Sequence, residues 1–542
     1  MNPASFLYSL RVGRWGIAGF SAAAFLLTWL QAAGFYQIAG HTAAERAAFG
    51  RSMTQLATQF TILFAAPIRP DTAGGYVQWR AYSFFAIVFG VWAMVSAYGA
   101  ARGDEERGTV EAVLATGMSR TDTLITRFLG FAAGCIVAVV FAAFGVLAAA
   151  VSAHESIGVD ALAGASVNVA GLAVACYALT LLICQLAPGR FALAGSGAVL
   201  LALFVLNGLS RQLHGLAGWR WLSPFRYYDL SQPLAPGGAF DVRAIEVLFG
   251  SAAVLLILAG LAFAYRDLGS PLVRIPTRPH AVSRDVDRNP AWRAPVARGI
   301  FERRYGLIAW TAGVSVVGIL FVAVTKSIVE PLLGLAQLRP YFDTFVTGSV
   351  YPSFLSFIWF GVAQLLIAAY AISEVGRWSA EDVDGRLESV LSTPTSRRGV
   401  IVERAATLLV GSLVIAAVSG VAVGVASHAQ GIDLDRGHLI AASLLLVPMA
   451  MFFAAAGAVI ASVLPRAAVG LLGSFAFLSY FLTQFGALFR WPAWTQNLSV
   501  FHLYGEPLTK GVDSTGLVLM LLVASVGFIA AALLLQRRSI GA

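Results

Sequence analysis

The stretch EERGTVEAVLATGMSR, residues 105–120, is a dense cluster of charge in a chain that is otherwise mostly apolar. Hydrophobic residues make up 58% of the 542 residues and charged residues only 12%, which is about half the charged share of an ordinary soluble domain. Apolar runs of about 20 residues, each long enough to cross the hydrocarbon core of a bilayer, recur along the chain. The stretch therefore reads as a polar loop between two membrane spans, and the sequence predicts an all-α polytopic membrane protein.

About 12 transmembrane helices are predicted, in two groups of six. They cover residues 15–38, 80–101, 128–152, 162–187, 191–212 and 243–265, and then 305–326, 352–375, 401–427, 438–464, 467–489 and 514–536. A polar segment rich in proline and arginine separates the two groups. We therefore expect a first six-span half at 1–265, a cytoplasmic linker at 266–300 and a second six-span half at 301–542.

The distribution of arginine predicts the orientation. Arginine is concentrated in the N-terminus, in the polar loops at 102–127 and 377–404, and in the linker, and such segments remain in the cytoplasm. We therefore expect a multi-pass protein of the cell (plasma) membrane with both termini cytoplasmic. The net charge of +9 is then explained by these loops and by anionic membrane lipids, so no nucleic-acid partner is expected.

The charged loop has a near-copy 277 residues further along the chain. GTVEAVLATGMSR, residues 108–120, aligns without a gap with GRLESVLSTPTSR, residues 385–397. A second pair of similar segments is LSPFRYY, residues 222–228, and LSVFHLY, residues 498–504. Together these matches predict a tandem duplication, because internal repeats are the sequence signature of repeated structural units. The 277-residue shift also aligns Arg127 with Arg404, Pro188 with Pro465, Phe204 with Phe481, and Asn207 with Gln484.

The repeated loop has the pattern of a short amphipathic helix. Val110, Val113 and Leu114 have the spacing of one apolar helical stripe, which predicts a helix lying along the cytoplasmic face of the membrane. Gly117 in the first copy, or Pro394 in the second, ends this helix. The next membrane helix then begins at a Ser-Arg pair, where serine or threonine can cap it.

The charges of the loop have two possible roles. On one interpretation it is an ordinary solvated loop whose arginines only fix topology. On the other, Glu105, Glu106 and Glu111 are available to a basic partner, and Arg120 and Arg127 to acids or lipid phosphates. Positive charge alone is enough to fix topology. The repetition of the same residues in both loops therefore favours a partner protein that binds this helix in each half.

The pattern at residues 106–120 resembles the coupling helix of ABC-2 type transporter permeases. The N-terminal segment before the first span, the aromatic, proline-containing loop before the sixth span and the six spans per half are also similar to that family. A fused two-half chain resembles bacterial permeases that export polyketide antibiotics, of the tetronasin-resistance kind. The composition, rich in Ala, Gly and Arg, suits a high-GC actinobacterium.

This resemblance implies a permease subunit of an ATP-driven exporter that is not itself an enzyme. No Gly-x4-Gly-Lys-Ser/Thr loop occurs, so no phosphate-binding loop of that kind is present. The implied partners are two copies of an ABC nucleotide-binding ATPase subunit, which hold ATP and Mg, and a lipophilic small-molecule substrate. We expect this chain to bind no cofactor and no metal. The implied ATPase-coupling residues are Glu105, Glu106, Gly108, Glu111, Thr116, Ser119, Arg120 and Arg127, with Gly385, Glu388, Thr393, Pro394, Ser396, Arg397 and Arg404.

Candidate residues for a substrate path come from symmetry and from the resemblance. Asn207 and Gln484 form a symmetric amide pair late in the fifth spans, suited either to a lipophilic cavity or to hydrogen bonds between helices. In ABC-2 permeases the second and fifth spans line the path, which nominates aromatic residues that could equally face lipid or the core. These aromatic candidates are Phe84, Phe85, Trp92, Phe204, Phe357, Trp359, Phe360 and Phe481.

Two further questions stay open at this level. The apolar loops at 219–234 and 491–508 either dip into the outer membrane face as exit gates or form an interfacial aromatic belt. Two other functions also remain. A proton-coupled secondary multidrug transporter is disfavoured because the spans lack a series of ionisable residues. A non-transporting membrane scaffold would use the loops to recruit a different partner.

Overall fold

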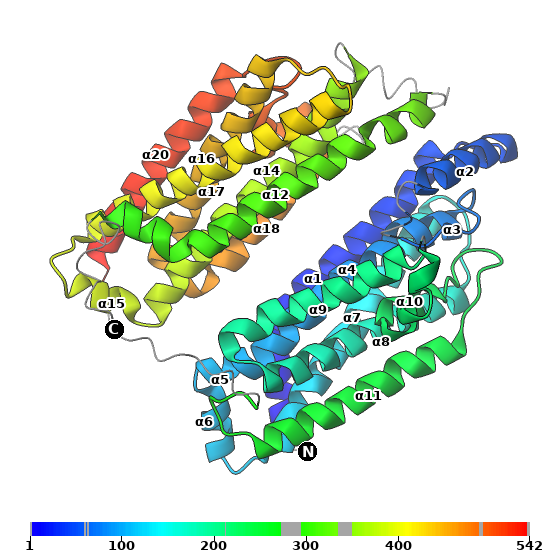
Figure 1. Cartoon of the computed structure of the whole chain (residues 1–542), viewed down its shortest axis with the longest axis horizontal. Helices are drawn as coiled ribbons and strands as arrows, with labels where there is room; N and C mark the ends of the chain where they lie inside the picture. Colours follow the sequence, from blue (N-terminus) through cyan, green and yellow to red (C-terminus); the bar gives the residue numbers. More distant parts are fainter. Residues whose placement is uncertain are drawn as a thin grey trace. The chain divides into compact units, whose positions relative to one another are not determined.

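The computed structural model is helical throughout the parts of the chain that it describes, and these parts contain no β-strand. The chain divides into two compact units, Met1–Pro279 and His280–Ala542, each with its own hydrophobic core. Twelve helical segments are long and apolar enough to cross a membrane, which confirms the all-α polytopic prediction (Figure 1). The described residues are 3–58, 61, 64–211, 213–272, 294–333, 349–486 and 492–538.

The first unit has six spanning segments joined by short helices. The spans are α1 (Pro3–Ile38), α3 (Ala73–Val77) continuing into α4 (Ser83–Tyr98), α7 (Arg120–Ser152), α8 (Val159–Leu186), α9 (Gly189–Leu209) and α11 (Val242–Tyr265). The short helices are α2 (Ala43–Ala57), α5 (Asp104–Glu106), α6 (Thr109–Ala115) and α10 (Pro224–Asp229). Wide π-helical turns at Gln78–Tyr82 and Gly99–Gly103 flank α4 within the second span.

The second unit has the same order of elements. Its spans are α12 (Pro295–Leu333), α14 (Val350–Val383), α16 (Arg397–Ala429), α17 (Arg436–Val463), α18 (Ala468–Gly486) and α20 (Ser514–Arg537), and its short helices are α15 (Arg386–Leu391) and α19 (Ala493–Asn497). Several helices extend beyond the predicted apolar spans. α7, for example, begins at Arg120 and not at residue 128, because Ser119 caps it in the polar loop.

Equivalent helices pack together in the two units. The first span contacts the third (α1 with α7, α12 with α16), the fourth contacts the sixth (α8 with α11, α17 with α20), and the second contacts the fourth (α4 with α8, α14 with α17). The repeat seen in the sequence thus corresponds to one pattern of helix packing used twice.

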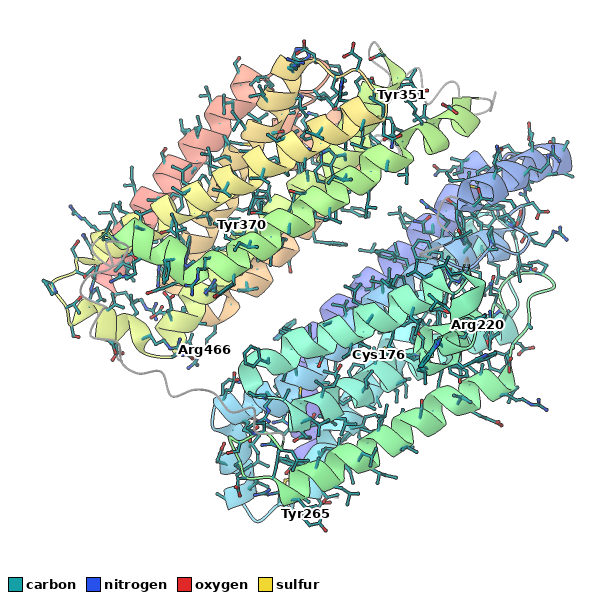
Figure 2. The ribbon with its side chains drawn as sticks, viewed as in Figure 1. Cys176, Arg220, Tyr265, Tyr351, Tyr370 and Arg466 are labelled. Carbon is teal, nitrogen blue, oxygen red and sulfur yellow. The ribbon has the colours of Figure 1, made fainter. Side chains whose placement is uncertain are left out.

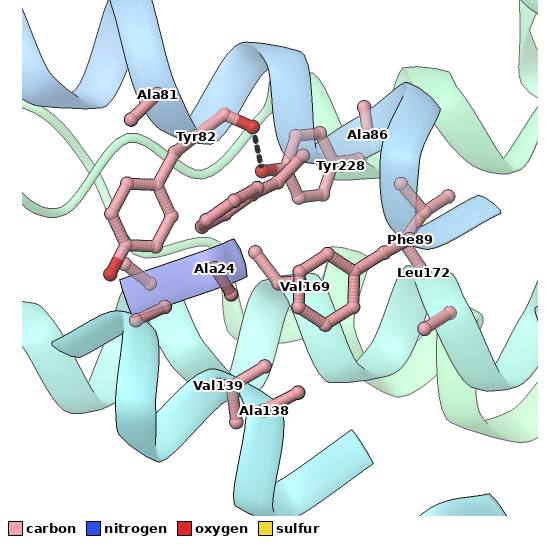
Figure 3. Close-up of a cluster of buried hydrophobic side chains, with 14 of the residues drawn as sticks. Ala24, Ala81, Tyr82, Ala86, Phe89, Ala138, Val139, Val169, Leu172 and Tyr228 are labelled. Carbon is pink, nitrogen blue, oxygen red and sulfur yellow. Dashed lines mark hydrogen bonds between the residues drawn. The ribbon is translucent and has the colours of Figure 1, made fainter. Parts of the chain in front are cut away.

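Small residues let α1 and α7 approach closely. A Cβ atom at Gly145 would overlap the hydroxyl of Thr28 and the carbonyl of Phe25. At this close approach Thr28 Oγ1 donates a hydrogen bond to the carbonyl of Ala142 across the interface, at 2.7 Å. Small residues at membrane helix interfaces permit such contacts between backbones. Behind them, Phe89 and Tyr82 fill the core of the unit (Figure 3).

Gly145→Leu should destabilise the first unit by about 1–3 kcal/mol, because the new side chain has no space between α7 and α1. The expected result is a lower apparent Tm of the full chain in nanodiscs. Gly250→Leu is the matched control, since a Cβ at Gly250 meets nothing within 4 Å inside its unit. Equal apparent Tm values for the two variants would contradict the α1–α7 packing.

Candidate functional site

The two short helices of the repeated loops, α6 and α15, are built in the same way. Each follows a glycine in the left-handed region, Gly108 with φ +70° and Gly385 with φ +72°, a conformation that other residues adopt at a cost. Each also inserts one apolar residue into its unit, Val110 or Leu387, and both of these side chains are buried. The repeated glycines therefore have a backbone role, and no contact with a partner is needed to explain them.

Both loops end at the predicted serine caps. Ser119 Oγ accepts a hydrogen bond from the backbone N–H of Asp122, and Ser396 Oγ accepts one from the N–H of Gly399, both at 3.0 Å. The threonines at the ends of the short helices, Thr116 and Thr393, donate their hydroxyls to backbone carbonyls three residues earlier. The prediction that serine caps the next span is confirmed, and these four repeated residues shape the loop.

The repeated arginines Arg120 and Arg397 bind inside the protein. Arg120 donates to the carbonyl of Phe263 at 2.9 Å and to that of Arg266, at the C-terminal end of α11. Arg397 donates to the carbonyl of Leu535 at 2.9 Å, at the C-terminal end of α20. Both arginines thus cap the end of a sixth span, because the last carbonyls of a helix lack partners and favour a positive charge.

A second pair of arginines, Arg127 and Arg404, is also engaged. Arg127 lies 2.6 Å from Asp104 Oδ2, and Arg404 lies 2.7 Å from Glu381 Oε2. Asp104 and Glu381 are related by the same shift of 277 residues. Each arginine of the third span thus binds an acid at the end of the second span, and the acid that Arg127 binds belongs to its own unit.

Glu105 lies in a buried cluster of charges. Its carboxylate accepts from Arg102 at 2.9 Å and from two nitrogens of Arg266 at 2.7 and 2.8 Å. The backbone N–H of Gly269 adds a fourth bond at 2.6 Å. The side chains of all three charged residues are at most 4% exposed. The expectation that Glu105 is available to a basic partner is wrong, since both of its oxygens are occupied.

The second unit contains a simpler form of this cluster. Asp382 takes the place of Glu105 and pairs with Arg538, which follows the sixth span as Arg266 does. The sequence did not predict this pairing, because the acid is Glu105 in the first copy and Asp382 in the second, so the two are not identical. The signal was present, since the shift of 277 residues aligns the acids Asp104-Glu105 with Glu381-Asp382.

The acids that remain on the surface are Glu106, Glu111 and Glu388, and all three are exposed. Glu106 bonds to Tyr98 within its own unit. Glu111 and Glu388 occupy equivalent places in the first turns of α6 and α15. Glu111 and Glu388 are thus exposed carboxylates at equivalent positions, and one buried apolar side chain attaches each short helix to its unit.

An open groove of about 360 Å³ runs beside α6. Tyr8 of α1, Val113 of α6 and Thr126 of α7 are among its lining residues. The Thr126 hydroxyl is buried and has no hydrogen-bond partner. The groove and Glu111 together form the exposed surface of the first loop.

Glu105→Gln should destabilise the chain by about 3–5 kcal/mol, because it leaves the charges of Arg102 and Arg266 buried without compensation. The apparent Tm of the purified full chain would report this loss. Glu111→Gln, at an exposed site, serves as the control and should leave the apparent Tm unchanged. Wild-type stability of Glu105→Gln would rule out the buried cluster.

Asn207, for which both a cavity and internal hydrogen bonds were considered, has a partner within its own unit. Asn207 is buried, and its Nδ2 donates to Asp229 Oδ2 at 2.6 Å. The same oxygen accepts from Arg211. Asn207 thus joins the fifth span to α10 and is not available to line a cavity. The side chain of Gln484 lies outside the described residues.

The aromatic candidates divide into packed and exposed residues. Phe85, Trp359 and Phe360 are at most 2% exposed, and they form part of the cores of their units. Phe84 and Phe357 are 41% and 46% exposed on the surfaces of their units. The remaining candidates make ring contacts within their units, Trp92 with Phe20, Phe204 with Phe225, and Phe481 with Phe477.

The loops before the sixth spans insert aromatic residues into the helix bundles. Tyr228 of α10 is buried and donates its hydroxyl to the carbonyl of Tyr82 at 2.6 Å (Figure 3). Tyr504 of the second unit donates to the carbonyl of Ala442 at the same distance. Burial raises the pKa of both phenols well above the usual value, so both remain donors. Both loops are therefore packed into the helix bundles of their units at Tyr228 and Tyr504, whereas Trp219 is exposed on the surface of its unit.

Twelve helices in the described residues are long and apolar enough to cross a membrane, and they define the class, a multi-pass membrane protein. The sequence profile described as "Multidrug efflux system permease Rv1217c, C-terminal domain" matches residues 6–266 and 293–537, so the chain belongs to this family. The chain is 29% identical over 364 residues to the multidrug efflux system permease protein Rv1217c of Mycobacterium tuberculosis (strain ATCC 25618 / H37Rv). The alignment covers 66% of this chain and 63% of that relative.

Proposed function

We propose that the chain is the membrane-spanning subunit of an ATP-driven exporter of the ABC-2 type, in the fused two-half form. Separate ATPase subunits bind ATP and Mg and engage α6 and α15, and the spans move lipophilic or amphiphilic compounds out of the cell. Membership of a family of multidrug efflux permeases supports the transport part of this proposal.

The observation that carries the ATPase part is the pair of exposed carboxylates, Glu111 and Glu388. Each stands on a short helix, and the loop that holds this helix is tied by ion pairs to the second, third and sixth spans of its unit. A push on such a helix is transmitted to the spans through these ion pairs, and most firmly in the first unit, where the buried Glu105–Arg266 pair resists separation. The groove beside α6 offers a place for an apolar side chain of the partner.

The buried acids support the alternative function, a proton-coupled secondary multidrug transporter, less well than they support the ATP-driven exporter. Among the described residues, the buried carboxylates are Asp104, Glu105 and Glu374. Each of them is paired with at least one arginine. A carboxylate held by a guanidinium favours its ionised form and is poorly suited to carrying protons.

Reversing the charge of both helices tests the proposal. Glu111→Lys combined with Glu388→Lys should weaken binding of the ATPase that co-purifies with the chain by about 10-fold or more, because two complementary pairs become repulsive. Co-purification and ATP hydrolysis stimulated by the permease are the measurements.

The matched control combines Glu246→Lys with Glu302→Lys, exposed acids that lie outside the short helices, one in each unit. It makes the same change of charge and should leave ATPase binding intact. If the Glu111 and Glu388 variant stimulates its ATPase like the control, α6 and α15 are not the coupling helices.

A further inference from the structure

Arg220 lies near α10 of the first unit, at the end opposite to α5 and α6 (Figures 1 and 2). Arg211 and Arg226 complete a cluster of three arginines around α10. Arg220 and Arg226 lie against the ring of Trp221, with 5.4 and 5.1 Å between each guanidinium carbon and the ring centroid. Arg211 lies close enough to lower the pKa of Arg226 through its charge. In the predicted orientation this end is the outer side of the membrane, where arginine is the disfavoured residue.

The positive charge of this cluster is only partly compensated. The Nε–H groups of Arg220 and Arg226 are buried and have no hydrogen-bond partner. The acid that acts on Arg226 is Asp229, but Asp229 Oδ2 already accepts from Asn207 and Arg211. The pKa of Arg226 is lowered, first by burial and then by the charge of Arg220. Partly buried cations without partners are unfavourable unless an anion joins them.

The second copy of this segment shows that folding does not require these charges. The buried residues that attach the segment to its bundle occur in both copies: Ser223 and Ser499, Phe225 and Phe501, Tyr228 and Tyr504. The residues around Trp221 differ between the copies. Gln496, Asn497, His502 and Gly505 stand where the first copy has Arg220, Trp221, Arg226 and Asp229.

Exposed apolar side chains adjoin the arginines. Trp219 is 61% exposed, Trp221 45% and Leu222 64%. A cationic pair beside an apolar surface matches a ligand with an anionic group on an apolar body, since guanidinium groups bind phosphate and carboxylate by two parallel hydrogen bonds. A small inorganic anion would use the arginines and leave the apolar surface uncovered.

We propose that Arg220 and Arg226 form a binding site for the phosphate or carboxylate group of an amphiphile, whose apolar part lies on Trp219 and Leu222. Two sources share this chemistry, an anionic lipid of the surrounding leaflet and an acidic compound under transport. The second source rests on the proposed export function, whereas the binding site does not. The first unit alone carries this site in the described residues, because the second copy lacks both arginines.

The test measures binding of radiolabelled dodecyl phosphate to the full chain in phosphatidylcholine nanodiscs, with empty nanodiscs subtracted. Arg220→Gln combined with Arg226→His introduces the residues of the second copy, so the segment retains a sequence compatible with its fold. This variant should bind at least about 10-fold more weakly than the wild type, because charge-assisted bonds are lost. Dodecyl maltoside, which is neutral, should bind both proteins equally.

Arg243→Gln is the matched control, since Arg243 is exposed at the start of α11 and lies outside the cluster. It should bind dodecyl phosphate like the wild type. Equal affinity of all three proteins for dodecyl phosphate would overturn the proposal. No ATP or ATPase is present, so a failure here is distinct from a failure of the proposed function.

A second arm separates the two sources of the anion. Part of the phosphatidylcholine is replaced by phosphatidylglycerol, and the titration of the wild type is repeated. Weaker binding of dodecyl phosphate would show that the lipid headgroup occupies the arginines. Unchanged binding would show that the site prefers a single-chain amphiphile to the bilayer lipid, as a transported acid requires.

Discussion

The ion pair between the end of the second span and the residues after the sixth is the interaction that positions each charged loop. Glu105 with Arg266, and Asp382 with Arg538, join chain segments that are far apart in sequence. The short helix begins a few residues later, after a left-handed glycine. In the first unit the pair is buried, so separating it would be expensive, and in the second unit a partly exposed pair occupies the equivalent place.

The sequence alone predicted the elements of the fold that depend on local chemistry. Apolar length predicted the spans, and the Ser-Arg pair predicted the start of α7 at Ser119. The spacing of Val110, Val113 and Leu114 likewise predicted a short helix, which the structure has as α6 with Val110 buried. These features depend on residues within a few positions of one another, so one sequence is enough to recognise them.

The partners of the charged groups could not be predicted in this way. Arg120 binds a helix end more than 140 residues away, Glu105 binds Arg266, and Asn207 binds Asp229. A single sequence shows that such groups are polar but not which carbonyl or carboxylate they reach after folding. For Asn207 the sequence therefore left both a cavity and an internal hydrogen bond open, and the structure shows the hydrogen bond. Burial in a low dielectric makes internal partners the rule for polar groups in spans.

Arg120 and Arg397, which cap the ends of α11 and α20, also affect how the protein adapts to bilayers of different thickness. Each guanidinium fixes the end of the sixth span against the start of the third. One boundary between hydrocarbon and water is therefore held at a defined level in each unit. Hydrophobic mismatch must then be accommodated by tilt or at the far ends of the spans, so a thinner bilayer would first strain the loops around Tyr228 and Tyr504.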